Sequence, residues 1–277
     1  MSANGLRPQS LVFTLFGDYI RHKSSRIWIG SLIKLLALFD VSEQATRSTV
    51  SRMVRRDWLT IEREGTTSYY ALTPAAQKVI NEGAARIFNF TPSIDKWNGC
   101  WQLVIYSIPE EQREGRDGLR GELPFLGFGM LTNAVWISPH DQRARLDELT
   151  TALNIKPYVQ IFTGTLEGFL PARDLVARCW NLDAINAGYA HFLEKHNASY
   201  CEFQQRLNAG EQIKPSEYFV RRFTLIHEYR AFPYRDPYLP ADLLPSNWYG
   251  NDATALFQKY HQLLASGANN YFESVFR

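Results

Sequence analysis

Cysteine is scarce in this 277-residue sequence, which contains only Cys100, Cys179 and Cys201. An odd number of scattered cysteines argues against a disulfide framework, and no pair has the spacing of metal ligands. Long apolar runs are also lacking. A stretch such as Leu35–Phe39 is far shorter than the roughly 20 residues that span a bilayer, and the N-terminus has no charged region followed by an apolar one. We therefore expect a cytoplasmic protein.

Catalytic signatures are missing as well. The sequence has no glycine-rich phosphate loop, no nucleophile elbow and no His-Glu-x-x-His motif. His191 and His196 are five residues apart rather than four, so they do not stack on one helical face as a zinc pair would. We expect both to be surface or packing residues. The sequence thus predicts a protein that is not an enzyme, with no catalytic residue, metal or cofactor.

Apolar residues, in contrast, are plentiful. They make up 45% of the chain, aromatic residues make up 14%, and the length predicts two or three domains. Charge is distributed unevenly, because residues 1–90 carry 12 Lys and Arg against 7 Asp and Glu, whereas the remainder carries 18 against 21. A basic N-terminal part on a mildly acidic body favours contact of that part with a polyanion.

The N-terminal part is predicted to form a winged helix-turn-helix. Apolar spacing indicates helices over residues 11–22 and 28–39, and a third helix that begins after the N-cap Ser42. Beyond Asp57 the sequence alternates as in a strand, turns at residues 65–67 and resumes a strand that leads to a further helix. Three helices followed by a two-stranded hairpin are typical of this fold.

The third helix has two distinct faces. Thr46, Val50, Met53 and Val54 share the apolar face, which predicts contact with the core. Arginine offers a bidentate fork to guanine, and Ser or Gln can bond to bases or phosphates, so the opposite face is suited to a DNA groove. The predicted DNA-binding residues of helix and wing are Gln44, Arg47, Ser48, Ser51, Arg52, Arg55, Arg63, Thr66 and Thr67. The alternative is an ordinary solvated helix whose arginines form ion pairs.

Here the sequence resembles a known family. The run "GDYI…WIGSLIKLLALFDVSEQATRSTVSRMVRRDWL…REGTTSYYALT" is similar to the N-terminal domain of the phenylacetate-degradation repressors, the PaaX-like transcriptional regulators. The matching positions are Arg47, Ser48, Ser51, Arg52, Trp58, Leu59, Gly65 and Tyr70. Asp57 stands where a glycine is more usual in the family. The resemblance implies a recognition helix that reads DNA.

The middle of the chain predicts a second domain. After a helix and a linker within residues 75–96, "WQLVIYSIPE" indicates a buried strand, followed by a helix over residues 111–123, two short strands, a helix over residues 141–153 and a last strand at residues 158–164. The order βαββαβ is that of a ferredoxin-like sandwich. In the family, this region resembles the CRISPR-associated nuclease Cas2.

A nuclease is therefore the alternative function from another class. Metal-dependent cleavage needs carboxylates at a strand end, but no aspartate lies on the first strand, and Glu110 and Glu111 follow its proline. We expect a packing or dimerising module instead. The third possibility is a regulator controlled by a protein partner without a small ligand.

The last third is predicted to be helical. Helices are expected from about Leu182 to Gly210, over residues 217–230 and over residues 251–276, with a proline-punctuated loop before the last. The segment "HEYR…RDPYLPADLLPSNWYG" closely resembles the PaaX-like C-terminal domain. The resemblance thus covers almost the whole chain and implies a homodimeric repressor of phenylacetate-type catabolic genes, released from operator DNA by an acyl-CoA such as phenylacetyl-CoA.

An acyl-CoA needs cations for its phosphates and an apolar slot for its acyl group. The candidate effector-binding residues are His227, Tyr229, Arg230, Arg235 and Trp248. Local ion pairs and core packing are the alternative for each. The predicted domains are a winged helix at residues 1–90, a dimerising Cas2-like domain at residues 97–171 and an effector-binding helical domain at residues 172–277. The fold class is α+β multidomain.

Overall fold

The computed structural model describes residues 7–23, 26–88 and 97–276. The chain forms two compact units. One comprises residues 1–90, 192–230 and 252–277, and the other comprises residues 91–191 and 231–251. The predicted linker after residue 88 lies outside the described residues.

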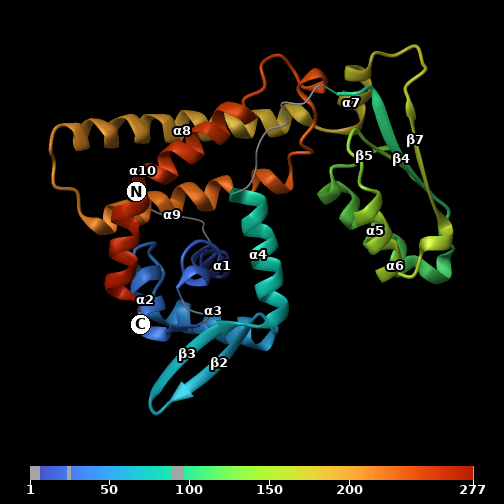
Figure 1. Cartoon of the computed structure of the whole chain (residues 1–277). Coiled ribbons are helices and arrows are strands. Elements are labelled where there is room, and N and C mark those ends of the chain that lie inside the picture. Colours follow the sequence, from blue (N-terminus) through green and yellow to red (C-terminus); the bar gives the residue numbers. More distant parts are fainter. Residues whose placement is uncertain (1–6, 24–25, 89–96, 277) are drawn as a thin grey trace. The chain divides into compact units, whose positions relative to one another are not determined.

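The first unit contains the winged helix. Helices α1 (Pro8–Asp18), α2 (Ile29–Ala37) and α3 (Glu43–Arg55) precede the hairpin formed by β2 (Leu59–Glu64) and β3 (Thr67–Leu72). The hairpin extends away from these helices (Figure 1). Helix α4 (Pro74–Phe88) follows. The predicted winged helix-turn-helix is confirmed.

One strand of this unit was not predicted. Residues Arg26–Trp28 form β1, which pairs antiparallel with β3 and makes a three-stranded sheet of order β1-β3-β2. The predicted helix over residues 28–39 therefore begins one residue later, at Ile29. Trp28 is extended because its backbone pairs with that of Tyr69 on β3. Hydrophobic periodicity along the chain gives no sign of this pairing.

Two C-terminal helices share the core of the winged helix. Helices α9 (Pro215–Tyr229) and α10 (Gly250–Val275) contribute Phe219, Phe223 and Phe272 to the same cluster of buried side chains as α1 and α2. The ring of Tyr19 lies 5.1 Å from that of Phe219 and 5.0 Å from that of Phe272. The core of this unit is therefore assembled from both ends of the chain.

A row of polar contacts joins α1 to α9, and we call it the polar seam. Positions 10, 14 and 18 are four residues apart, so they lie on one face of α1. The seam consists of Ser10 with Arg230, Thr14 with His227 and Asp18 with Arg222. The partner numbers fall as the α1 numbers rise, so the two helices run antiparallel.

The second unit contains the βαββαβ sandwich. Its strands are β4 (Cys100–Tyr106), β5 (Gly129–Thr132), β6 (Val135–Ser138) and β7 (Val159–Thr165), and the sheet order is β5-β6-β4-β7 with every pair antiparallel. Helices α5 (Arg113–Glu122) and α6 (Arg143–Ala152) complete the ferredoxin-like order. This prediction is confirmed.

Both faces of β4 are covered within this unit. Val104 and Tyr106 pack with Leu119 of α5 and Leu146 of α6. On the opposite face, Trp101 packs with residues of α7 (Ala172–Cys179) and with Leu239 and Leu243 of the proline-rich loop. Burial on both faces explains why β4 is a nearly continuous apolar run.

The remaining helical predictions agree with the structure. Helix α8 (Leu182–Asn208) is followed by Gly210 at a positive φ of 75°, and α9 and α10 begin within two residues of their predicted starts. None of the helices in the described ranges is long and apolar enough to cross a membrane.

Candidate nucleic-acid interface

Helix α3 is held by its N-cap and by its apolar face. The Ser42 hydroxyl accepts a hydrogen bond from the Ala45 N–H at 3.2 Å, as predicted. Thr46, Val50 and Met53 are buried against the core of the unit. These contacts determine which face of the helix is left to solvent.

The opposite face of α3 is polar and exposed. All its predicted DNA-binding residues are accessible to solvent, and they are Gln44, Arg47, Ser48, Ser51, Arg52 and Arg55. In the wing, Arg63 and Thr66 are exposed and Thr67 is half-buried. The fold therefore brings the helix and wing residues to the surface of one unit.

The arginines of this face differ in their partners. Arg47 donates through Nε to Glu43 Oε1 at 2.8 Å, an i,i+4 ion pair on the helix surface. Arg52 donates to the Thr49 hydroxyl at 3.3 Å. Among the described residues, no carboxylate lies within 4.0 Å of the guanidinium groups of Arg52, Arg55 or Arg63. These three cations are thus available to an external anion.

The wing is braced by a cation that sequence reasoning did not single out. Arg26 on β1 contacts Glu62 Oε2 at 2.8 Å and Glu64 Oε1 at 2.7 Å, and its guanidinium lies 4.4 Å from the ring centroid of Tyr69. It compensates the negative charges of these two side chains of β2. The one feature of the sequence that could have pointed to Arg26 was the excess of basic residues before position 90.

Two turns with positive φ fix the ends of this interface. Gly65, at φ 59°, occupies the first central position of the two-residue turn between β2 and β3, where an L side chain is strained. Asp57, at φ 57°, ends α3, and the Trp58 N–H bonds to the Met53 carbonyl at 2.9 Å in a Schellman-type cap. Glycine is the usual residue in that conformation.

Comparison with known proteins agrees with this architecture. Three family models match consecutive parts of the chain: "PaaX-like protein" at residues 7–76, "PaaX protein central Cas2-like domain" at residues 94–176 and "PaaX-like protein C-terminal domain" at residues 180–274. The chain belongs to the PaaX-like family. Its match to the transcriptional repressor PaaX of Escherichia coli (strain K12) is 28% identical over 267 residues, covering 94% of this chain and 81% of the relative.

A solved structure supports the fold of this PaaX-like chain. The uncharacterized protein Rv0674 from Mycobacterium tuberculosis superposes with a TM-score of 0.60 at 22% sequence identity, and the alignment covers 96% of this chain and 98% of that one. At this identity the likeness concerns the fold alone.

Three of the candidate effector residues lie at the end of α9. Tyr229 is fully buried, stacks on Phe257 at 3.9 Å and shares a hydrogen bond of 2.9 Å with the Thr254 hydroxyl. His227 and Arg230 belong to the polar seam. Burial lowers the pKa of His227 to about 4, and the neighbouring Arg230 acts in the same direction.

The other two candidates belong to the second unit. Arg235 is exposed, and Trp248 is half-buried with its ring 5.6 Å from that of Tyr189 in an edge-on contact. The proline-rich loop around them is ordered by the buried Asp236, which accepts from the Tyr189 hydroxyl and the Tyr238 N–H, both at 2.8 Å. The PaaX-like signature of this loop thus has a structural basis.

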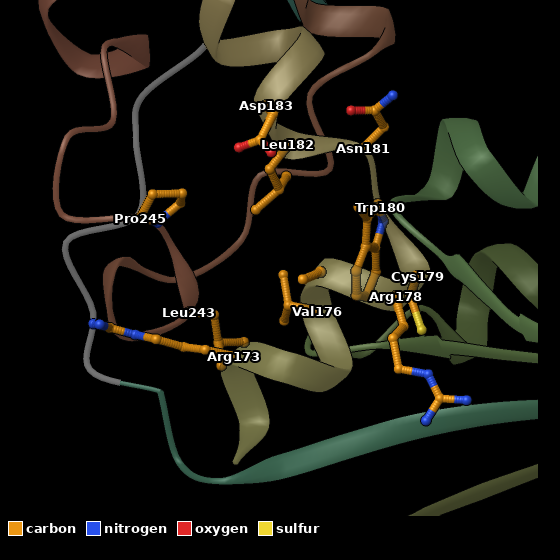
Figure 2. A pocket seen from close by; sticks show the side chains of 11 residues that line it. Arg173, Val176, Arg178, Cys179, Trp180, Asn181, Leu182, Asp183, Leu243 and Pro245 are labelled. Atoms are coloured by element: carbon orange, nitrogen blue, oxygen red, sulfur yellow. The ribbon is translucent and has the colours of Figure 1, made fainter. Parts of the chain in front are cut away.

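A pocket of about 360 Å³ lies near this loop, in the second unit (Figure 2). Val176 of α7, Trp180 and Leu182 form part of its wall, and Arg173 and Arg178 lie on opposite sides in this view. Arg173 also donates to the Asp242 carbonyl at 3.1 Å. None of the five candidate effector residues lines this pocket.

In the described ranges, no group of three or more His, Cys, Asp or Glu side chains is placed to hold a metal ion. In the Cas2-like sheet, Gln102 of β4 donates to Asp141 at 3.1 Å, and Arg143 binds the same carboxylate and lowers its pKa. His191 is exposed and His196 is buried against Glu228 at 2.9 Å, as predicted for surface and packing residues.

Proposed function

We propose that this PaaX-like protein is a dimeric DNA-binding repressor of aromatic, phenylacetate-type catabolic genes. Helix α3 enters the major groove of operator DNA, and the wing formed by β2 and β3 contacts the backbone or minor groove. Two copies related by a two-fold axis read a roughly palindromic operator. The relation to a transcriptional repressor at 28% identity supports the regulatory role.

The observation that carries this proposal is the exposed polar face of α3. It combines Ser48 and Ser51, which suit hydrogen bonding to bases or phosphates, with Arg52 and Arg55, which have no carboxylate partner among the described residues. The N-cap and the apolar face fix the orientation of the helix, so its backbone needs no further ordering when these side chains meet DNA.

Replacement of Arg52 with Ala tests the DNA contact. We expect operator binding to weaken by about 1–3 kcal/mol, which is the usual value of a bidentate base contact. The measurement is a fluorescence anisotropy titration against an operator selected by the protein from a random library. Arg145→Ala, which removes an exposed arginine paired with Glu148 on α6, is the matched control and leaves affinity unchanged. If Arg52→Ala and wild type bind the operator with equal affinity, Arg52 does not contact DNA.

The dimer is proposed to form through β7 of the Cas2-like domain. This strand lies at one edge of the sheet and is seven residues long, whereas the other edge strand, β5, has four residues and a register shift. Phe162 on β7 is 55% exposed, and Phe169 just beyond it is fully exposed. An exposed, regular apolar edge favours pairing with a second strand.

Sedimentation velocity tests this surface. We expect Phe162→Glu to sediment as a monomer, because two copies of the charge would face each other across the paired edges. Met130→Glu is the matched control, since Met130 is 43% exposed on the opposite edge strand, and it should remain dimeric. A dimer that survives Phe162→Glu at micromolar concentration would contradict the assignment.

The effector is proposed to be an acyl-CoA such as phenylacetyl-CoA. Its candidate binding residues are His227, Tyr229 and Arg230 in the first unit, and Arg235 and Trp248 in the second. His227 and Arg230 contact α1 in the polar seam, so a ligand that takes over these contacts would change how α1 is held. Tenfold weaker operator binding requires about 1.4 kcal/mol of coupling. Titration of the operator complex with phenylacetyl-CoA and other acyl-CoAs should release DNA. No release by any of them would favour control by a partner protein.

A further inference from the structure

A second pocket, of about 270 Å³, lies within the unit that contains the winged helix. Its walls come from the end of α1, the short helix at Ile20–His22, the end of α4, and helices α9 and α10. It contains none of the five candidate effector residues. Its lining is both charged and aromatic, and the aromatic side chains include Tyr19, Phe88 and Phe272.

Two polar atoms of the lining residues are buried without a hydrogen-bond partner among the described residues. They are Asp18 Oδ2 and Arg21 Nε. The Asp18 side chain is 4% exposed, and its partners lie at Oδ1, where Arg222 is at 3.2 Å and His261 Nε2 at 3.5 Å. An unsatisfied buried polar group costs about 1–3 kcal/mol, and most such groups in native proteins are paired. These two residues therefore offer an acceptor and a donor to a guest molecule.

The charges of the lining favour a guest with one negative charge. Arg21, Lys23 and Arg222 are cationic, and Asp18 and Glu273 are anionic. Burial lowers the pKa of His22. His261 Nε2 lies 3.0 Å from Arg222 Nε and 3.5 Å from Asp18 Oδ1. The Arg, Lys, Asp and Glu side chains of the lining thus sum to one positive charge.

The size of the pocket limits the guest to about one ring. A cavity of about 150 Å³ holds a benzene molecule, and pockets for drug-sized ligands measure roughly 300–1,000 Å³. At about 270 Å³ there is room for one aromatic ring with two small substituents. A whole acyl-CoA does not fit, so this pocket is distinct from the effector site proposed above.

We propose that this pocket binds a small aromatic carboxylate that also carries a hydroxyl group. The carboxylate accepts a hydrogen bond from Arg21 Nε, and the hydroxyl donates to Asp18 Oδ2. The ring lies among Tyr19, Phe88 and Phe272. Because α1 packs against α3, an occupied pocket also changes operator affinity. Only this regulatory consequence rests on the proposed function, since binding of the acid can be measured without DNA.

Calorimetry on the full-length protein tests the site, with 4-hydroxybenzoate as the probe. We expect saturable binding, at least tenfold weaker for three analogues that each lack one feature: benzoate, 4-hydroxybenzyl alcohol and the ringless 3-hydroxybutyrate. Arg21→Gln, checked for folding by circular dichroism, should weaken binding of the probe at least tenfold. Lys78→Gln, an exposed change on α4, is the matched control. No binding by wild type up to millimolar concentration, or equal binding by Arg21→Gln, overturns the proposal.

Two further outcomes separate this site from the proposed function. Saturating 4-hydroxybenzoate should change the affinity of wild type for its selected operator at least threefold, and an unchanged affinity would overturn the regulatory consequence. If unliganded wild type selects no operator at all, the proposed DNA binding is wrong. Calorimetry still tests whether the pocket binds the aromatic acid.

Discussion

The buried ion pair between Asp18 and Arg222 gives a direct test of whether the C-terminal helix α9 stabilises the winged helix. The two side chains are 4% and 8% exposed, and the Arg222 guanidinium also donates to Asn269 Oδ1 at 2.7 Å and lies 4.9 Å from the Tyr19 ring centroid. Removing one partner of such a pair leaves an uncompensated buried charge, which costs about 3–5 kcal/mol. Loss of the cation over Tyr19 contributes about 0.5–2 kcal/mol within that total.

We therefore expect Arg222→Met to lower the free energy of unfolding of the first unit by about 3–5 kcal/mol. Hydrogen exchange followed by mass spectrometry measures the effect locally, because amide protection reports the opening free energy of each segment. Protection should fall together in peptides from α1, α3 and α9. In the double variant with Asp18→Asn, part of the loss should return, giving a coupling energy of roughly 1–3 kcal/mol.

The control is Lys195→Met, which removes an exposed cation of the same unit paired with Glu228. Exposed ion pairs contribute about 0–1 kcal/mol, so protection should scarcely change. If Arg222→Met lowers protection in α9 but leaves α1 and α3 at their wild-type values, the helices do not form one cooperative unit and the reasoning is wrong.

Two further predictions concern single positions in this unit. Asp57→Gly should raise the free energy of unfolding by about 0.5–1 kcal/mol, because residue 57 has φ 57° and glycine has no Cβ penalty there. Urea denaturation measures this change. Asp117→Gly within α5 should instead lower stability by roughly 0.3 kcal/mol, the difference between the helix propensities of Asp and Gly. The pKa of His227 is lowered to about 4 from an ordinary 6.5. As pH falls, the unfolded chain therefore takes up a proton at this residue before the folded chain does. The folded state should lose up to about 3 kcal/mol of stability between pH 6.5 and pH 4. His227→Gln should remove that part of the pH dependence, and identical slopes for variant and wild type would refute it.

Much of this fold was predictable because its signals are local. The α3 N-cap at Ser42, the apolar spacing of Val50 and Met53 and the hairpin turn at Gly65 each depend on residues close together in the chain. The same holds for β4, whose burial on both faces gives a continuous apolar run. The three residues of β1 were not predictable, since a strand that short has no periodicity and exists through its pairing with β3.

The candidate interface was predictable to a similar degree. Opposite faces of one helix follow from its period, so the exposure of Arg52 and Arg55 could be inferred from the buried Val50 and Met53. The role of Arg26 could not, because its partners Glu62 and Glu64 are more than 30 residues away.

The local pattern of the chain was enough to predict the main helices, every strand except β1, the polar face of α3 and the turn at Gly65, because helix period, capping and turn preferences act over a few residues. Only the tertiary structure decided that Asp18 meets Arg222, that α9 and α10 complete the core of the winged helix, and that a charged pocket lies where they meet. Contacts between residues about 200 positions apart depend on how the helices pack, and no local pattern in the chain encodes that packing.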